Sequence, residues 1–512
     1  MNTEQKALPI DPVKTRKKNL FSSLAAVGCC LVFVILFAAF FAADTDRIAY
    51  PLEGAVQNYN PYVQQFDALQ KGQTYLDIEP DPRLAELENP YNPTERTKAK
   101  VNSLWDRAYY NGRYYSNFGI APVITVYMPY YFLTGSLPGT GTVMTIFLCL
   151  AAIFMPLTIC AWAEEFSPGV PAWLRAVAAV AVFHCSLIAL IARGRTPFYY
   201  VAAVAAGSFV SVFFWLCIAA YRAKSTWHRC VRYALAGVFF GLCFQSRLPV
   251  AVIAAFLVIP GLWFFIIGRE REGKRAWPVI RELLCLGVPV MLFFAGSMIF
   301  NAMRFSGPLD FGHNWQLTVT DNRTLKIRLT DIPYAVFHYF LDMPAKSEVY
   351  PYINFSYAKF ASYGHYQYRD AGFGILAIPL MWTLLASPAV IFSGKFEKSR
   401  RVFTAAAVVG IFVTALTDFC MGGIIYRYTA DMTLVGGIFS VIILFSLCER
   451  IKNLNFRATK AVTIATYIAV AAFLCVSVVA SLRLFVINDN ANVMKYSEKV
   501  AEVLPKILPF KP

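Results

Sequence analysis

The apolar positions of this sequence fall in long uninterrupted blocks instead of a short repeating pattern. They cover residues 20–43, 120–136, 143–162, 173–191, 198–221, 233–244, 250–267, 283–301, 373–391, 402–420, 433–447 and 461–486. A helix needs about 20 apolar residues to cross a bilayer, and most of these blocks approach or exceed that length. The pattern therefore predicts an all-α polytopic membrane protein with roughly 11–13 transmembrane helices.

Two long polar stretches, residues 44–119 and 303–372, interrupt the apolar blocks. In the first stretch, short helical patterns alternate with turn signals, which predicts amphipathic helices at the membrane surface. We accordingly expect five parts: a cytoplasmic tail (1–19), an N-terminal transmembrane module with the external loop 44–119 (20–302), a second external loop (303–372), C-terminal transmembrane helices (373–487) and an external tail (488–512).

The chain has a formal net charge of +16, and the positions of its basic residues explain this excess. Lysine and arginine cluster beside apolar blocks, at residues 14–18, 222–232, 269–281, 395–401 and 450–460. Cytoplasmic loops of membrane proteins carry such clusters. The charge is thus explained without a nucleic-acid partner, and the protein's environment is a lipid bilayer. Both long polar loops then lie on the external side.

The segment 120–136 conflicts with this orientation if it crosses the membrane. Counting it as a crossing would place the basic segment 222–232 outside, against the positive-inside rule. The segment is short, rich in tyrosine and interrupted by Pro122 and Pro129. Irregular backbone at membrane depth is tolerated where it is buried in protein or lines a cavity. We therefore expect that 120–136 is not a full crossing and that it lies near a site.

The first polar loop offers several carboxylates, of which Asp67 lies in the most regular local pattern. A helix begun by Pro61 places Asp67 one turn from Lys71. Two interpretations remain open. Asp67 is either a solvated carboxylate paired with Lys71 or a general base close to the membrane interface.

Aromatic and basic residues alternate at the end of the same loop, in WDRAYYNGRYYSNFG at residues 105–119. Tyrosine and arginine at a membrane boundary are commonly interfacial anchors. The alternative is a sugar and phosphate site, because arginine binds phosphate oxygens through two parallel hydrogen bonds.

Arginines also recur at the external ends of apolar blocks, although that side has few basic residues. They are Arg193, Arg195, Arg247, Arg304 and Arg427. Each by itself is explained as an anchor, whereas the set as a whole is better explained as a pocket for a lipid phosphate. Asp431 follows Arg427 by one turn, so we expect it to orient that side chain. Asp418 either pairs with an external arginine or contributes to the cavity.

Three stretches resemble bacterial membrane glycosyltransferases of the GT-C superfamily. The first runs from QFDALQKG (65–72) through ENPYNPTER (88–96) to WDRAYYNGRYYSNFGIAPV (105–123). The second is NAMRFSGPLDFGHNWQ (301–316), and the third is MGGIIYRYTAD (421–431). They occur in the same order over most of the chain. The resemblance includes the group of aminoarabinose and protein-mannosyl transferases.

This resemblance implies a helical bundle with a catalytic first external loop. It implies transfer of a sugar from a polyprenyl-phosphate donor, in one displacement assisted by a carboxylate. In the related transferases an acidic pair falls early in the loop, where this chain has Asn58. The catalytic carboxylate is accordingly one of Asp44, Asp46, Glu53 and Asp67, and Asp67 is favoured.

The remaining site residues follow from the same resemblance. Arg427 and Arg113, with Arg247 and Arg304, would bind the lipid phosphate, and Tyr114 and Tyr115 would shape the sugar site. Asp106 would position the acceptor or a divalent cation, Mg²⁺ or Mn²⁺, and no cofactor is certain.

The sequence thus predicts a glycosyltransferase of a bacterial cytoplasmic membrane with its active site on the extracytoplasmic face. The acceptor would be an extracytoplasmic glycan, lipid or protein. Two other functions remain: a flippase or transporter for lipid-linked sugars, and a polymerase or ligase of surface polysaccharide. A transporter predicts inverted repeats and ionisable residues near the bilayer midplane.

Overall fold

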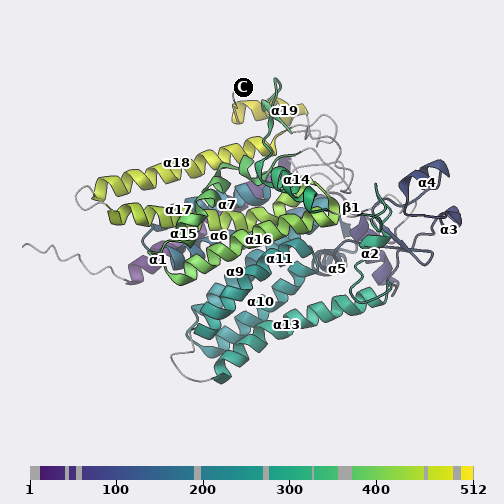
Figure 1. Ribbon diagram of the computed structural model, residues 1–512, viewed down its shortest axis with the longest axis horizontal. Coiled ribbons are helices and arrows are strands. Elements are labelled where there is room, and N and C mark those ends of the chain that lie inside the picture. The colour runs from purple at the N-terminus through teal and green to yellow at the C-terminus, as the bar shows by residue number, and fades with distance from the viewer. Residues whose placement is uncertain are drawn as a thin grey trace, which may run out of the picture.

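A computed structural model describes residues 12–40, 45–52, 60–188, 198–268, 276–325, 328–355, 372–454, 459–487 and 498–510. The protein is a bundle of long helices, which run side by side along the longest axis of the molecule (Figure 1). These helices are α1 (Pro12–Phe40), α6 (Thr140–Phe166), α7 (Ala172–Phe183), α9 (Phe198–Tyr221), α10 (Thr226–Phe244), α11 (Leu248–Gly261), α13 (Ala276–Ala302), α16 (Lys398–Gly422), α17 (Ala430–Leu454) and α18 (Thr459–Phe485).

Within the described residues, eight helices are long and apolar enough to cross a membrane, and three shorter apolar helices accompany them. Each of the twelve apolar blocks of the sequence has a helical counterpart here, which confirms the predicted fold class of an all-α polytopic membrane protein. The α9 span and the span Tyr426–Lys452 are both 89% buried, whereas the α13 span is 11% buried. The central helices are hydrophobic on all sides because they contact other helices all round.

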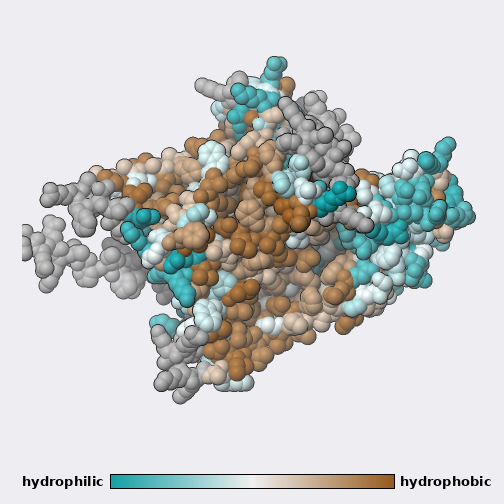
Figure 2. All heavy atoms as spheres, in the orientation of Figure 1, coloured by the Kyte–Doolittle hydropathy of each residue, from teal (hydrophilic) through white to brown (hydrophobic). Residues whose placement is uncertain are grey.

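The two ends of the bundle differ in composition. The segments 17–18, 222–225, 395–398 and 450–452 lie at one end, here named the basic end. The polar loops lie at the opposite end, here named the loop end (Figure 1). In Figure 2, hydrophobic residues cover the middle of the visible face and hydrophilic residues gather towards its two ends. This distribution fits a protein that spans a bilayer.

The segment 120–136 begins and ends at the loop end. It forms a π-helical turn, Val123–Tyr127, and the short helix α5 (Met128–Thr134), which ends at Gly135 in the left-handed conformation (φ +70°). Directly after it, β4 (Leu137–Pro138) pairs with β1 (Arg47–Ile48), which follows α1. The helical part of the segment, Val123–Thr134, has twelve residues. It spans about 18 Å at roughly 1.5 Å per residue, less than the roughly 30 Å hydrocarbon core. The structure thus agrees with the prediction that this segment is not a full crossing.

Residues 60–119 and 303–325 together form a small unit beyond the bundle, here named the loop unit. The first stretch contributes α2 (Pro61–Gln70), α3 (Arg83–Glu86), α4 (Pro93–Lys98), and the hairpin of β2 (Ala108–Tyr110) and β3 (Arg113–Tyr115). The second contributes Leu317, which is packed in one apolar cluster with Leu76, Leu84 and Tyr114. The two polar loops, separate in the sequence, therefore share a core.

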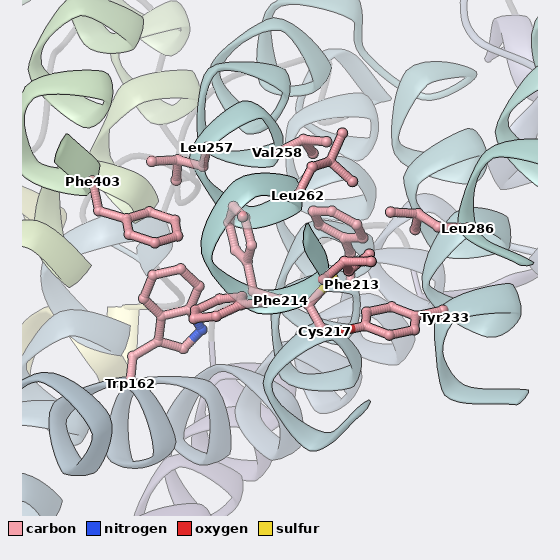
Figure 3. Close-up of a pocket in the computed structure, with 13 residues that line it drawn as sticks. Trp162, Phe213, Phe214, Cys217, Tyr233, Leu257, Val258, Leu262, Leu286 and Phe403 are labelled. Carbon is pink, nitrogen blue, oxygen red and sulfur yellow. The ribbon is translucent and has the colours of Figure 1, made fainter. Parts of the chain in front are cut away.

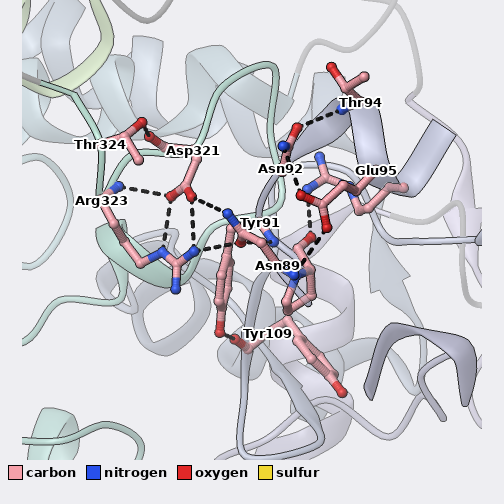
Figure 4. Close-up of polar contacts among 11 residues, drawn as sticks. Asn89, Tyr91, Asn92, Thr94, Glu95, Tyr109, Asp321, Arg323 and Thr324 are labelled. Atoms are coloured by element: carbon pink, nitrogen blue, oxygen red, sulfur yellow. Dashed lines mark hydrogen bonds and ion pairs between the residues drawn. The ribbon is translucent and has the colours of Figure 1, made fainter. Parts of the chain in front are cut away.

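Polar contacts also join the two halves of the loop unit. Asp321 accepts hydrogen bonds from Arg323 (2.8 and 3.0 Å) and from the Asn89 amide (2.8 Å), as Figure 4 shows. Its bonds to the Arg323 guanidinium hold the pKa of Asp321 at about 2. Arg96 of α4 donates to the Thr318 carbonyl oxygen (2.7 Å). These contacts hold the second loop against the first.

Helix α2 begins at Pro61, as the sequence predicts. The Asn60 side chain accepts a hydrogen bond from the Tyr62 backbone N–H (2.9 Å) and donates one to the Thr140 hydroxyl (2.8 Å). Eight of the ten α2 residues are buried. The helix is therefore packed against the bundle and the rest of the loop unit.

The remaining elements are short. They are the π-helical turns His184–Ile188, Leu262–Ile267 and Phe337–Leu341, the 3₁₀ segments His313–Trp315, Leu329–Asp331, Ile375–Ala377, Pro379–Ala386 and Tyr426–Thr429, the helices α14 (Ile332–Val336), α15 (Ser387–Ile391) and α19 (Glu498–Ile507), and the strands β5 (Ala345–Lys346) and β6 (Ile353–Asn354). The C-terminal segment contacts the second loop, because the Tyr350 hydroxyl donates to the Leu508 carbonyl oxygen (3.0 Å).

Candidate active site

A chain of polar and aromatic side chains lies where the loop unit meets the bundle. Its members, here named the loop-end site, are Asp106, Tyr199, Arg427, Tyr428, Arg247, Asp431 and Asp418. They come from the turn before β2, the start of α9, the turn between α10 and α11, the end of α16, the 3₁₀ segment Tyr426–Thr429 and the start of α17.

Asp106 is the carboxylate of this site that belongs to the loop unit. The Tyr199 hydroxyl donates a hydrogen bond to its Oδ2, and the Gln316 amide lies 3.5 Å from its Oδ1. Its backbone N–H donates to the Leu317 carbonyl oxygen (2.9 Å). The backbone is in the left-handed region (φ +56°), a conformation in which non-glycine residues are uncommon and often functional. The partly exposed carboxylate has a fixed orientation.

Arg107 holds the turn that contains Asp106 through hydrogen bonds. Its guanidinium donates to the Gln64 side chain of α2 (2.8 Å) and to the Trp105 carbonyl oxygen (3.2 Å). Burial lowers the pKa of Arg107 to about 10, so the side chain stays positively charged at neutral pH. The Asp106 turn is thereby attached to α2.

Arg427 is a cation in contact with aromatic rings. Its guanidinium carbon lies 4.7 Å from the centre of the Tyr199 ring and 5.3 Å from that of Tyr428. Among the residues that the structure describes, no hydrogen bond or ion pair to Arg427 is found. Stacking on aromatic faces orients a guanidinium without occupying its N–H donors. These donors are thus available to an anion.

Arg247 is the second cation, and it is held by carboxylates. Its Nε lies 2.5 and 2.6 Å from the two carboxylate oxygens of Asp431, and its Nη2 lies 3.6 Å from Oδ1 of Asp418. Both carboxylates are fully buried. The Arg247 guanidinium also lies 4.4 Å from the Tyr428 ring centre, on which Arg427 is stacked too. The two arginines therefore share the Tyr428 ring, and the carboxylates offset the charge of Arg247.

Gly119 brings the end of the first loop onto the end of α10. A Cβ atom at this position would lie 2.1 Å from the Gln245 carbonyl oxygen and 2.7 Å from that of Ser246. These carbonyl groups directly precede Arg247. Only glycine allows the two backbones to come this close. The distance between the loop unit and the turn that carries Arg247 therefore depends on Gly119.

We expect the Gly119→Ala variant to be destabilised by roughly 1–3 kcal/mol, because the added methyl group forces the two backbones apart. Thermal unfolding in detergent measures this. Gly28→Ala is the matched control, since a Cβ at Gly28 meets nothing within 4 Å. Equal melting temperatures for the two variants would contradict the proposed close approach.

The structure brings together three of the residues selected from the sequence, namely Asp106, Arg247 and Arg427. Asp431 was expected to orient Arg427, but it forms its ion pair with Arg247. Asp418 lies beside Arg247, which agrees with the interpretation that it pairs with an external arginine. Tyr199 was missed. The available signal was a tyrosine in the loop-end segment RTPFYY, which the sequence does not connect to Asp106.

Asp67 has other partners. Its Oδ1 accepts a hydrogen bond from the Tyr50 hydroxyl (3.1 Å), and its Oδ2 lies 2.9 Å from the Lys71 ammonium nitrogen. Asp67 is therefore paired with Lys71, as one interpretation of the sequence had it. Its side chain is buried, however, and not solvated. Asp46 is exposed beside β1, and Asp44, Glu53, Asn58, Arg193 and Arg195 lie outside the described residues.

The other selected residues take part in packing within the loop unit. The Arg113 guanidinium is 4.0 Å from the Tyr75 ring centre, and Tyr115 contacts the Phe305 ring. Tyr114 is buried, and burial raises the pKa of its hydroxyl to about 12. Arg304 donates to the Ser116 carbonyl oxygen and the Asn301 side chain, 2.8 Å each.

The divalent cation expected at Asp106 stays a prediction. Asp106 accepts the hydrogen bond of the Tyr199 hydroxyl and has the cation of Arg107 nearby. Searched over the described residues, the structure has no group of three or more His, Cys, Asp or Glu side chains that could hold a metal ion. We therefore assign no step to a metal.

The fold and the site define a polytopic membrane protein with a polar site where two long loops meet the bundle. No family model matches the sequence, and no curated protein matches it. One similar solved structure is ArnT from Cupriavidus metallidurans bound to undecaprenyl phosphate, with a TM-score of 0.40 and 11% identity over 89% of this chain and 74% of ArnT.

A second similar structure is the archaeal oligosaccharyltransferase AglB from Archaeoglobus fulgidus, in complex with an inhibitory peptide and a dolichol-phosphate. The TM-score is 0.40 and the identity 11%, over 95% of this chain and 60% of AglB. Both structures are distant likenesses. At this distance they assign no activity, and the functional proposal rests on the side chains of the site.

Proposed function

We propose that this protein is a glycosyltransferase that transfers a sugar from a polyprenyl-phosphate donor to an extracytoplasmic glycan, lipid or protein. One observation carries the proposal: the oriented carboxylate of Asp106 is linked through Tyr199 to Arg427, whose N–H groups have no described protein acceptor. Transfer from a phosphate-linked sugar needs a base for the acceptor and a cation for the departing phosphate. The loop-end site supplies both.

The reaction is a single displacement at the anomeric carbon of the donor. The acceptor oxygen forms a bond to this carbon while the bond to the phosphate oxygen breaks, and the phosphate leaves with the bonding electron pair. Asp106 takes the proton of the acceptor hydroxyl. Tyr199 holds one carboxylate oxygen, which leaves the other, with its long contact to Gln316, to face the acceptor.

The arginines stabilise the charge that develops on the departing lipid phosphate. Arg427 offers the two parallel donors that match a phosphate. Arg247 contacts Tyr428, the ring on which Arg427 is stacked, and Asp431 keeps the Arg247 guanidinium in place. Arg304, which the sequence also suggested, donates to the Ser116 carbonyl oxygen and the Asn301 side chain, so we give it a structural role. Arg113, also suggested, is exposed on the hairpin of β2 and β3, where it is stacked on Tyr75.

The orientation follows from the charges. With the basic end in the cytoplasm, as the positive-inside rule requires, the loop-end site is on the extracytoplasmic side. We propose a bacterial cytoplasmic membrane, where polyprenyl-phosphate sugars and external acceptors meet. A flippase would use the same lipid-linked sugar, but it would move the donor without cleaving it.

The test is cleavage of the donor. Purified protein in bilayer nanodiscs is incubated with a panel of polyprenyl-phosphate sugars, and released polyprenyl phosphate is measured. We expect release with at least one donor, and movement across the bilayer without release would overturn the proposal in favour of a flippase.

Arg427→Gln should lower the rate of this cleavage about 10²–10³-fold, the usual cost of losing one group that stabilises developing charge. Arg427→Lys should recover only part of the rate, because lysine lacks the two parallel donors. Arg113→Gln is the matched control, and we expect a nearly unchanged rate. A greater loss with Arg113→Gln than with Arg427→Gln would move the phosphate site to the hairpin of β2 and β3.

A further inference from the structure

Arg427 follows a short non-helical segment that begins where α16 ends. This segment, residues 423–427, is here named the Arg427 turn. Gly423 has the dihedral angles φ +83° and ψ −136°, a conformation with positive φ that favours glycine. Ile424 and Ile425 follow, and both are buried. The polar backbone groups of a buried turn have no helix partners, so another part of the chain has to supply them.

One side chain of the second polar stretch supplies two of these partners. Tyr339 lies in the π-helical turn Phe337–Leu341 and is 1% exposed. Its hydroxyl donates a hydrogen bond to the Gly423 carbonyl oxygen (2.7 Å) and accepts one from the Ile425 backbone N–H (3.4 Å). A phenolic hydroxyl donates and accepts at the same time, so both bonds form together. The Tyr339 hydroxyl therefore closes the Arg427 turn.

Two aromatic rings hold the next residue of the turn. The Tyr426 ring centre lies 4.8 Å from that of Phe373 and 5.5 Å from that of Phe355. All three side chains are buried, and Phe355 belongs to the second polar stretch, as Tyr339 does. The residue directly before Arg427 is thus fixed by packing, and the residues before it are fixed by the Tyr339 hydroxyl.

The opposite end of α16 is held in a different way. Phe403, near the start of the helix, packs against Trp162 and Phe265, with ring centres 5.4 Å apart in both pairs. These rings lie beside a pocket lined by apolar side chains (Figure 3). Apolar packing is non-directional, whereas a hydrogen bond fixes the direction of the groups that it joins. The direction in which the chain leaves α16 is therefore set at the loop end.

We propose that Tyr339 is a positioning residue for sugar transfer, because its hydroxyl holds the turn from which the Arg427 side chain extends towards the lipid phosphate. This inference rests on the proposed function, in which Arg427 stabilises the departing phosphate. Stacking on Tyr199 and Tyr428 orients the Arg427 guanidinium, and Tyr339 fixes the backbone behind it. The part of the second polar stretch outside the loop unit thereby contributes to the reaction.

The expected effect is on kcat. Tyr339→Phe keeps the buried ring and removes the hydroxyl, so the turn shifts while the bundle stays folded. A misplacement of about 1 Å costs up to about 10²-fold in rate. We therefore expect Tyr339→Phe to lower kcat for donor cleavage about 10- to 100-fold. KM for the donor should stay within about twofold of wild type, because the charge that Arg427 stabilises develops only as the phosphate leaves.

A double variant separates positioning from a general effect on the fold. In the Arg427→Gln background the guanidinium is absent, so Tyr339→Phe should lower the rate by less than about a further twofold. Tyr350→Phe is the matched control, since its hydroxyl also lies in the second polar stretch and donates to a backbone carbonyl, that of Leu508 (3.0 Å). It should leave kcat within about twofold of wild type. Rates are measured in nanodiscs per folded molecule, and melting temperatures are recorded for each variant.

Phe355→Leu covers the case in which Tyr339→Phe does not fold. It loosens the packing on Tyr426 and should lower kcat several-fold, again with little further loss in the Arg427→Gln background. If wild type cleaves no donor, or Arg427→Gln leaves the rate unchanged, the proposed function or its phosphate site fails, and this inference fails with it. If Arg427→Gln lowers the rate, the positioning role alone is overturned by a Tyr339→Phe variant with the wild-type kcat. It is equally overturned if the losses of the two substitutions multiply in the double variant.

Discussion

The Asp106→Asn variant is expected to lose sugar transfer by about 10²–10⁴-fold, the usual contribution of a general base. Asparagine has the same shape and still accepts the hydrogen bond of Tyr199, so the turn should keep its geometry. It cannot, however, take the proton of the acceptor hydroxyl. Transfer to the acceptor, measured at saturating donor together with the melting temperature, separates loss of the base from loss of the fold.

Two other aspartates of the first loop serve as controls. Asp77→Asn, at an exposed position, should leave the rate unchanged. Asp67→Asn should lower the melting temperature, because it weakens the contact of a buried carboxylate with Lys71, while the rate per folded molecule is retained. If Asp67→Asn abolishes transfer and Asp106→Asn does not, the base is Asp67, as the resemblance to the GT-C transferases favoured.

Local sequence rules predicted the contact partner of Asp67 but not the partners of Asp106. Pro61 begins α2, and the spacing of four residues from Asp67 to Lys71 predicted their contact, because residues one turn apart face each other on any helix. The partners of Asp106 are not local. Tyr199 is 93 residues away and Gln316 is 210 residues away, so their meeting depends on how two loops and α9 pack.

The segment 120–136 shows that a global constraint can predict what local patterns miss. Its apolar composition alone suggested a membrane crossing. The charge distribution required an odd number of crossings among the four apolar blocks between the loop 44–119 and the basic segment 222–232. The pairing of β1 with β4 keeps both ends of the segment 120–136 at the loop end. No comparable constraint applied to Asp431. Its spacing from Arg427 suggested an interaction, yet the two helix ends bring Arg247 to it from 184 residues away.

Replacing Arg247 by methionine is expected to destabilise the protein by about 3–5 kcal/mol, the usual cost of removing one partner of a buried ion pair. Asp431 and Asp418 would then be buried without the guanidinium that lies 2.5 and 3.6 Å from their oxygens. Methionine fills a similar apolar volume, so a cavity adds little. Reversible unfolding in mixed micelles measures the change in the free energy of unfolding.

Neutralising both carboxylates distinguishes a charge effect from a packing effect. The triple variant Arg247→Met, Asp418→Asn, Asp431→Asn should recover most of the stability, because no buried charge is left without a partner. Arg83→Met, which removes an exposed arginine paired with Asp81, should change stability little. A triple variant that is as unstable as Arg247→Met alone would mean that Arg247 stabilises the bundle through its packing against Tyr428, and the buried ion pair would then have only a positioning role.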